Sequence, residues 1–246
     1  MPARDHPAHT DDDDLDRVLA VLDFDGTITA DDCMAVVLAR HVAQWPQLQA
    51  AVARGRMTQV DAFEKAVRLL RVPRELVLAD FAEAAALRRG FGEFLGWLLG
   101  QRARAAVISA GFRPGIEAVW RREGLPAIPV YAAELVGEPG HELEMVLDGR
   151  FGDCPICGAG HCKAAVIRSL RREGDFVVAF GDGSRDLCMA RAADCVFARA
   201  DLARLCEREG IPWTPFEHFT GARQALVEQH RANRRLHRSS APGDDV

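Results

Sequence analysis

Two aspartates, Asp23 and Asp25, stand two residues apart in the segment DFDGT. Residues 18–22 before them are all apolar, which predicts a buried strand that ends where the acids begin. A carboxylate in that place can attack phosphorus, its neighbour can carry a proton, and a hard cation can neutralise the charge that they gather with a phosphate. The alternative is an acidic strand-to-loop junction, because Asp and Gly are common turn residues.

Two later segments also place polar groups after apolar runs. Residues 105–108 predict a second buried strand, and Ser109-Ala110-Gly111 after it can hold phosphate oxygens with a hydroxyl and backbone N–H groups. Residues 176–180 predict a third strand, followed by the segment GDGSRD with Asp182 and Asp186. The carboxyl ends of strands are the usual ligand site in an open parallel sheet, so we expect these groups to meet.

A lysine, Lys163, begins a helical pattern of apolar residues between the second and third of these segments. An isolated lysine at a helix start is usually solvated, but beside a phosphate it supplies a compact positive charge. Taken together, DFDGT, SAG, the lysine and GDGSRD resemble the haloacid dehalogenase superfamily, specifically its phosphate monoester hydrolases. The resemblance spans about residues 18–220.

The resemblance implies roles for individual residues. Asp23 resembles the nucleophile that becomes an aspartyl phosphate, and Asp25 the acid/base that protonates the leaving oxygen and then activates water. Ser109 and Lys163 resemble the phosphate-binding pair. It also implies a magnesium site, in which Asp182 joins the Asp23 carboxylate and the Asp25 backbone carbonyl, while Asp186 orients Lys163 or a metal-bound water.

The charge balance agrees with a Mg²⁺ cofactor. Magnesium prefers oxygen ligands and commonly binds one or two carboxylates together with substrate phosphate oxygens, as Asp23 and Asp182 would allow. Without the cation and Lys163, repulsion among the carboxylates and the phosphate would raise the carboxylate pKa values and weaken the nucleophile.

The 246 residues, 48% of them hydrophobic, are enough to bury a large core. The order of expected strands and helices, together with the resemblance, predicts an α/β protein with a Rossmann-like parallel sheet core. We expect the catalytic core at residues 17–30 and 90–231, a helical cap inserted after the first strand at 31–89, and flexible tails at 1–16 and 232–246. Thr58 and Asp61 predict a capping box within the cap. Asp32 is expected either to face the substrate or to cap a helix. Residues 131–136 and 142–147 predict a small β-hairpin excursion.

Cysteines gather just before the lysine. Cys154, Cys157, His161 and Cys162 lie in the segment CPICGAGHCK, whose single half-site is a weak zinc signal. We expect a reduced, Gly-rich loop that shapes the approach of the lysine, with structural zinc as the alternative and a disulfide disfavoured. Cys33, Cys188, Cys195 and Cys206 are expected to be small buried residues.

The cysteine-rich segment and the residues after GDGSRD are also similar to the methionine-salvage phosphatases that act on 2-hydroxy-3-keto-5-methylthiopentenyl-1-phosphate. That small phosphorylated metabolite is therefore the expected substrate, and phosphoserine or another small phosphorylated alcohol is the alternative. A phosphotransferase or a dehalogenase would share the nucleophile, although alkyl halide displacement does not require Asp25. A catalytically silent binding module on the same fold is the alternative of another class.

The net charge of −5 gives no electrostatic case for nucleic acid or an anionic membrane. The acidic start resembles no signal peptide and no apolar run reaches a membrane span, so we expect a cytoplasmic protein. The sequence leaves the oligomeric state open.

Overall fold

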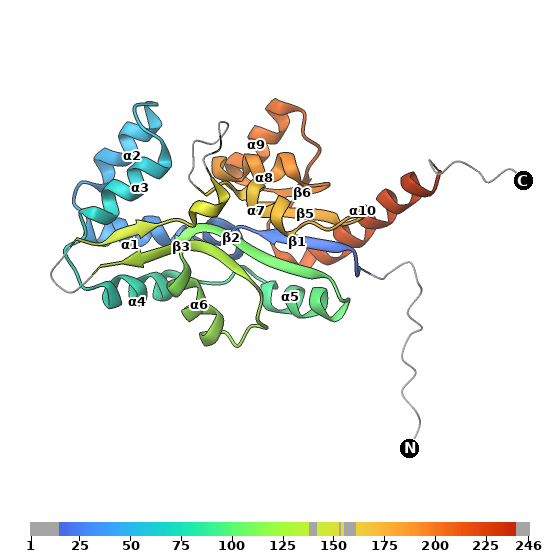
Figure 1. Ribbon diagram of the computed structural model, residues 1–246, viewed down its shortest axis with the longest axis horizontal. Coiled ribbons are helices and arrows are strands. Elements are labelled where there is room, and N and C mark those ends of the chain that lie inside the picture. The colour runs from blue at the N-terminus through green and yellow to red at the C-terminus, as the bar shows by residue number, and fades with distance from the viewer. Residues whose placement is uncertain (1–14, 138–141, 153, 155–160, 240–246) are drawn as a thin grey trace, which may run out of the picture.

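The computed structural model describes residues 15–137, 142–152, 154 and 161–239. Within them lies a seven-stranded sheet with the order β4-β3-β2-β1-β5-β6-β7 (Figure 1). All neighbouring strands are parallel except β3 and β4, which are antiparallel. The α/β class with a parallel core is therefore confirmed. In chain order the strands are β1 (Val18–Leu22), β2 (Arg104–Phe112), β3 (Val130–Val136), β4 (Glu144–Val146), β5 (Phe176–Gly181), β6 (Cys195–Ala198) and β7 (Thr214–Pro215).

Strand β1 is central because β2 pairs with one of its edges and β5 with the other. Its side chains alternate between the two faces of the sheet. Leu19 and Val21 pack with residues of α7 (Lys163–Leu170) and α8 (Leu187–Ala192), whereas Val18, Ala20 and Leu22 belong to the larger core. Because β2 to β4 extend from one edge of β1 and β5 to β7 from the other, its carboxyl end is the switch point at which open α/β sheets bind ligands.

Helices cover both faces of this sheet. Figure 1 shows α7, α8 and α9 (Ala200–Glu209) over one face and α5 (Phe91–Gly100) and α6 (Arg113–Arg122) over the other. Aromatic rings fill the contact between β5, α5 and the last helix, α10 (Phe219–Ser239). Phe180 lies 5.5 Å from both Phe94 and Phe219, measured between ring centroids. This packing fixes the end of β5, from which the GDGSRD segment departs.

Five α-helices lie between β1 and β2, namely α5 and, before it, α1 (Cys33–His41), α2 (Trp45–Ala53), α3 (Gln59–Arg68) and α4 (Arg74–Ala84). The predicted capping box opens α3, with the Thr58 and Asp61 side chains bonded to each other's backbone N–H groups. In Figure 1, α2 and α3 lie at one end of the sheet, where α3 contacts the edge strand β4, whereas α4 lies beside α6. Phe81 of α4 contacts α6 so closely that a Cβ on Gly115 would lie 2.5 Å from its ring.

Two boundaries differ from expectation. Strand β2 does not end before Ser109 but continues through SAG to Phe112, with its register on β3 shifting between Ile108 and Phe112. Helix α10 continues to Ser239, so residues 232–239 are helical where a tail was expected. The hairpin of β3 and β4 is confirmed, while residues 138–141 at its turn lie outside the described part. None of the described helices is both long and apolar enough to span a bilayer.

Candidate active site

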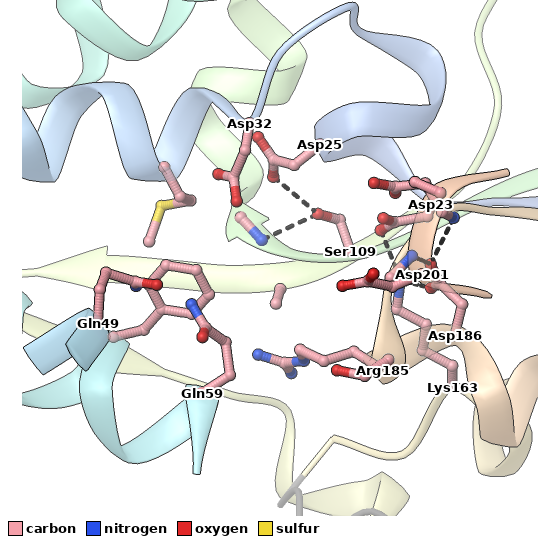
Figure 2. Close-up of a pocket in the computed structure, with 18 residues that line it drawn as sticks. Asp23, Asp25, Asp32, Gln49, Gln59, Ser109, Lys163, Arg185, Asp186 and Asp201 are labelled. Atoms are coloured by element: carbon pink, nitrogen blue, oxygen red, sulfur yellow. Dashed lines mark hydrogen bonds and ion pairs between the residues drawn. The ribbon is translucent and has the colours of Figure 1, made fainter. Parts of the chain in front are cut away.

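A pocket of about 370 Å³ lies at the carboxyl ends of the central strands (Figure 2). The sequence-predicted site residues all line it: Asp23, Asp25, Asp32, Ser109, Ala110, Gly111, Lys163, Asp182 and Asp186. The cap side of the pocket is formed by Met34, Gln49, Gln59 and Phe63, and the remaining lining residues are Gly183, Ser184, Arg185, Ala200 and Asp201. Residues 140 or more positions apart in the chain therefore share one cavity.

Lys163 is the buried cation of the pocket. Only 4% of the residue is exposed, and its Nζ donates to Asp23 Oδ1 at 2.5 Å and to Asp186 Oδ1 at 2.6 Å. The other oxygen of Asp186 accepts from the backbone N–H groups of Asp182 and Gly183, at 3.0 Å each. Asp186 is thus held on both oxygens, and it fixes the position of the lysine ammonium.

Asp23 follows β1 directly and is 8% exposed. Burial raises its pKa well above the ordinary value, and the negative charge of Asp186 adds to this, while the nearby Lys163 charge opposes it. The ionised form of Asp23 therefore depends on positive charge brought close to it. Lys163 supplies one such charge.

Asp25 lies against the second strand rather than beside the lysine. Its Oδ1 accepts from the Cys33 N–H at 2.9 Å and its Oδ2 from the Ser109 hydroxyl at 3.4 Å. Burial raises the pKa of Asp25 to about 7, and the negative charge of Asp32 is the second largest cause of this rise. A carboxyl group with such a pKa can both donate and accept a proton near neutral pH, as general acid–base work requires.

The SAG segment holds Asp25 at close range. The Gly111 N–H donates to Ser109 Oγ at 2.9 Å, so it is not directed at a phosphate as expected. A Cβ on Gly111 would lie 2.6 Å from Asp25 Oδ2, which explains why glycine stands there. This strand still presents the Ser109 hydroxyl and the backbone of Ala110 to the pocket.

Asp32 serves the helix as well as the pocket. It is the N-cap of α1, and its Oδ1 accepts from the Ala35 N–H at 2.8 Å. The same side chain lines the cavity and acts electrostatically on Asp25. The capping role expected for Asp32 is therefore confirmed, and the same side chain lines the pocket.

Three carboxylates form a group suited to a hard cation. Oxygens of Asp23, Asp182 and Asp186 all lie within 4.8 Å of one another. Burial, then the charge of Asp186, raises the pKa of Asp182 to about 6. The three carboxylates carry more negative charge than Lys163 can balance, and all their donor atoms are oxygens. The group therefore fits Mg²⁺. Asp182 also accepts from Thr27 Oγ1 at 2.9 Å, which orients it.

The charge on Asp182 gives a stability prediction. Its pKa rises from 3.8 to about 6 on folding, so between these pH values the folded protein holds a proton that the unfolded chain has lost. Stability therefore falls as pH rises through this range and stays reduced above it. In metal-free protein at pH 8, Asp182→Asn should raise the melting temperature by about 2–4 °C. In a domain of this size, that shift corresponds to a gain of about 1 kcal/mol in the free energy of unfolding.

The same measurement at pH 4.5 is the control, because Asp182 is then largely protonated in the folded protein, most of the cost of burying its charge is absent, and the advantage of the variant should shrink. Differential scanning calorimetry in a chelator measures both. An Asp182→Asn variant that is less stable than the parent at pH 8 would contradict the electrostatic account.

Sequence reasoning missed Arg88, which fixes the loop that follows the two acids. This arginine is 7% exposed and lies outside the pocket. Its Nε donates to the Thr27 carbonyl at 2.9 Å, and its Nη2 to the carbonyls of Gly26 and Thr29 at 2.8 and 3.0 Å. The Gly26 carbonyl also accepts from Arg199 Nη1 at 2.8 Å. No local pattern reveals these contacts, because about 60 residues separate Arg88 from the loop.

Arg88→Met should lower the free energy of unfolding by about 2–4 kcal/mol, because several buried carbonyls lose a charged donor at once. Urea unfolding measures this difference. The matched control is Arg89→Met, since the neighbouring Arg89 side chain is exposed. Equal stability of the two variants would show that Arg88 does not hold the loop.

The cap side of the pocket was also not identified from the sequence. Met34, Gln49, Gln59 and Phe63 line the pocket from α1, α2 and α3. Figure 2 shows Gln49 and Gln59 on the side of the cavity opposite Asp23. Gln49 Nε2 is buried and has no hydrogen-bond partner among the described residues. Arg54 and Arg56, which follow α2, are exposed and do not line the pocket, whereas Arg185 of the GDGSRD segment does.

Known proteins are similar to this chain in sequence and in fold. The family model described as haloacid dehalogenase-like hydrolase matches residues 20–191. Two similar proteins are named 2-hydroxy-3-keto-5-methylthiopentenyl-1-phosphate phosphatase. The one from Microcystis aeruginosa (strain NIES-843 / IAM M-2473) is 31% identical over 211 residues, covering 83% of this chain and 95% of its own. The one from Exiguobacterium sibiricum is 29% identical over 211 residues, covering 80% and 90%.

Solved structures share the fold at lower identity. A phospho-aspartyl intermediate analogue of phosphoserine phosphatase has a TM-score of 0.62 at 20% identity, covering 82% of this chain and 93% of that one. A probable phosphoserine phosphatase from Vibrio cholerae, in unliganded form, has a TM-score of 0.65 at 16% identity, covering 92% and 69%.

Proposed function

Because this chain belongs to the haloacid dehalogenase-like hydrolases, we propose that it hydrolyses a phosphate monoester through an aspartyl phosphate on Asp23. The observation that carries the proposal is the shared pocket of Asp23, Asp25, Lys163 and Asp182. Each has the partner or the shifted pKa that its role requires. Alkyl halide displacement needs no second acid, so the raised pKa of Asp25 favours phosphoryl transfer.

In the first half of the reaction, an Asp23 oxygen attacks phosphorus while Lys163 stabilises charge on the phosphoryl oxygens. The Ser109 hydroxyl, buried beside Asp25, positions the phosphate. Asp25 in its protonated form gives its proton to the leaving oxygen. In the second half, ionised Asp25 removes a proton from water, which attacks the aspartyl phosphate and frees Asp23.

A Mg²⁺ ion would be held by the carboxylates of Asp23 and Asp182 and by the backbone carbonyl of Asp25. When bound, it supplies positive charge that neutralises the phosphate and the surrounding carboxylates. Asp186 then remains bonded to Lys163 and to backbone N–H groups. The proposal is supported by the oxygen-only donor set and by the raised pKa of Asp182, which a cation would reverse.

For the substrate we infer 2-hydroxy-3-keto-5-methylthiopentenyl-1-phosphate, the compound in the names of the similar phosphatases. Met34 and Phe63 offer apolar surface for a methylthio chain, and the amides of Gln49 and Gln59 can bond its hydroxyl and keto oxygens. The buried Gln49 Nε2 supports this choice, because a buried donor without an acceptor costs about 1–3 kcal/mol that a substrate oxygen would recover.

Phosphoserine is the second candidate, because Asp32 and Arg185 both line the pocket and carry the charges that an amino acid needs. We expect kcat/KM for the keto-enol phosphate to exceed that for phosphoserine by at least about tenfold, or 1.4 kcal/mol. A phosphate-release assay with both substrates measures this ratio. An equal or reversed ratio would favour the phosphoserine reading.

The Gln49→Leu variant extends this test. It should reduce the ratio of kcat/KM for the keto-enol phosphate to kcat/KM for a simple aryl phosphate, because the aryl group offers that amide no oxygen. Retention of the full ratio in Gln49→Leu would show that Gln49 does not contact the substrate.

A further inference from the structure

Three cysteine sulfurs meet behind the catalytic lysine. Cys154 follows the short helix Gly149–Phe151, Cys162 is the N-cap of α7, and Cys188 lies in α8. Their Sγ atoms all lie within 4.8 Å of one another, and Cys162 and Cys188 are 2% and 3% exposed. Cys188 is buried, as expected, but it is more than a small core residue because it joins two cysteines of another segment.

The spacing of the sulfurs fits a tetrahedral metal centre. Zinc–thiolate bonds are about 2.3 Å long, which at a tetrahedral angle places two sulfurs about 3.8 Å apart. The Sγ atoms of Cys154 and Cys188 are separated by 3.8 Å. A disulfide requires about 2.05 Å and would join two of the three sulfurs, leaving the third beside it.

We propose that Cys154, Cys162 and Cys188 bind one Zn²⁺ ion as thiolates. Zinc suits this set because thiolates are soft ligands and structural zinc sites commonly contain three or four cysteines. The set differs from the one open in the sequence. Cys157 lies outside the described residues, and His161 packs edge-on against Phe151 at 5.4 Å and is not among the clustered ligands.

The position of the ion gives it a structural consequence. Cys162 directly precedes Lys163, and Cys188 follows Asp186 by two residues. A metal held by both would therefore join the start of α7 to α8 and stabilise the contact between Lys163 Nζ and Asp186 Oδ1. The site is separate from the carboxylates that we assign to Mg²⁺, so it does not depend on the proposed reaction.

Metal content tests the proposal without any activity assay. The full chain is expressed with zinc in the medium, purified in a reducing buffer without chelator, and analysed by mass spectrometry of the elements. We expect about one zinc per chain, and less than about one fifth of that in each of Cys154→Ala, Cys162→Ala and Cys188→Ala. Cys206→Ala, a buried cysteine of α9 in a separate cluster, is the matched control and should keep the zinc.

Asp182→Asn should also keep the zinc, which separates this site from the carboxylate group. If the cysteine variants do not fold, cobalt added to the metal-free parent replaces them as the test. We expect intense thiolate-to-cobalt absorption that one equivalent of Zn²⁺ abolishes. A folded parent that holds no zinc and shows no such absorption would overturn the proposal. Zinc retained in the cysteine variants would also overturn it.

Discussion

Asp23→Asn is expected to lower kcat by at least about three orders of magnitude, because an amide cannot replace the carboxylate as the attacking group. The fold should persist, since Lys163 keeps its bond to Asp186 at 2.6 Å. Loss of a buried carboxylate whose pKa is raised by burial should if anything stabilise the metal-free protein. Steady-state phosphate release, with circular dichroism on the same sample, measures both effects.

The matched control is Asp31→Asn, because the Asp31 side chain is exposed and does not line the pocket. It should retain parental activity within about twofold, as surface substitutions usually do. Activity of Asp23→Asn within tenfold of the parent would remove Asp23 from the role of nucleophile.

Asp25→Asn is expected to slow turnover by about two to four orders of magnitude, since a positioned acid or base contributes about that much. The amide keeps the shape of the side chain and can still accept from the Cys33 N–H, now found at 2.9 Å. It cannot give a proton to the leaving oxygen or take one from water. Both halves of the reaction should therefore slow.

Leaving-group dependence separates these two halves. An aryl phosphate with a weakly basic leaving group needs little protonation, so Asp25→Asn should release its first equivalent of phenol rapidly and then stall with a phosphorylated enzyme. An alkyl phosphate should show no such burst, because its departure needs the missing proton. An equal, burst-free loss on both substrates would show that Asp25 does not act as the acid.

The acid–base role of Asp25 also predicts how kcat/KM depends on pH. The pKa of Asp25 is raised to about 7, so the fraction able to donate a proton falls as pH rises beyond that value. In the parent, kcat/KM for an alkyl phosphate should therefore decline above about pH 7, and this decline should vanish in Asp25→Asn.

Much of the fold and most of the candidate site follow from local patterns. Apolar runs identify β1 and β5 because a strand buried on both faces tolerates few polar residues, and the acids after them mark the carboxyl ends. The end of β2 was misplaced because SAG carries small polar residues typical of a loop. In the structure these residues remain in the strand, where Ser109 and Gly111 contact Asp25.

The contacts that were missed depend on tertiary packing. Arg88 reaches a loop about 60 residues earlier, and Cys188 meets a cysteine 34 residues away, and neither separation has a periodicity that a sequence pattern can reveal. The end of α10 was misplaced for another reason. Its last turns are rich in arginine and resemble a solvated tail, yet Leu226 and His230 within the same helix are buried.

Identification of the phosphorylated residue tests the central claim most directly. The parent enzyme is mixed with substrate and Mg²⁺, quenched in acid within the first turnover, digested and analysed by mass spectrometry. We predict one phosphoryl group, on Asp23, that disappears on chase with buffer and is absent in Asp23→Asn. Phosphate on any other residue of the chain, or turnover with no phosphorylated residue under a quench that preserves acyl phosphates, would contradict the account.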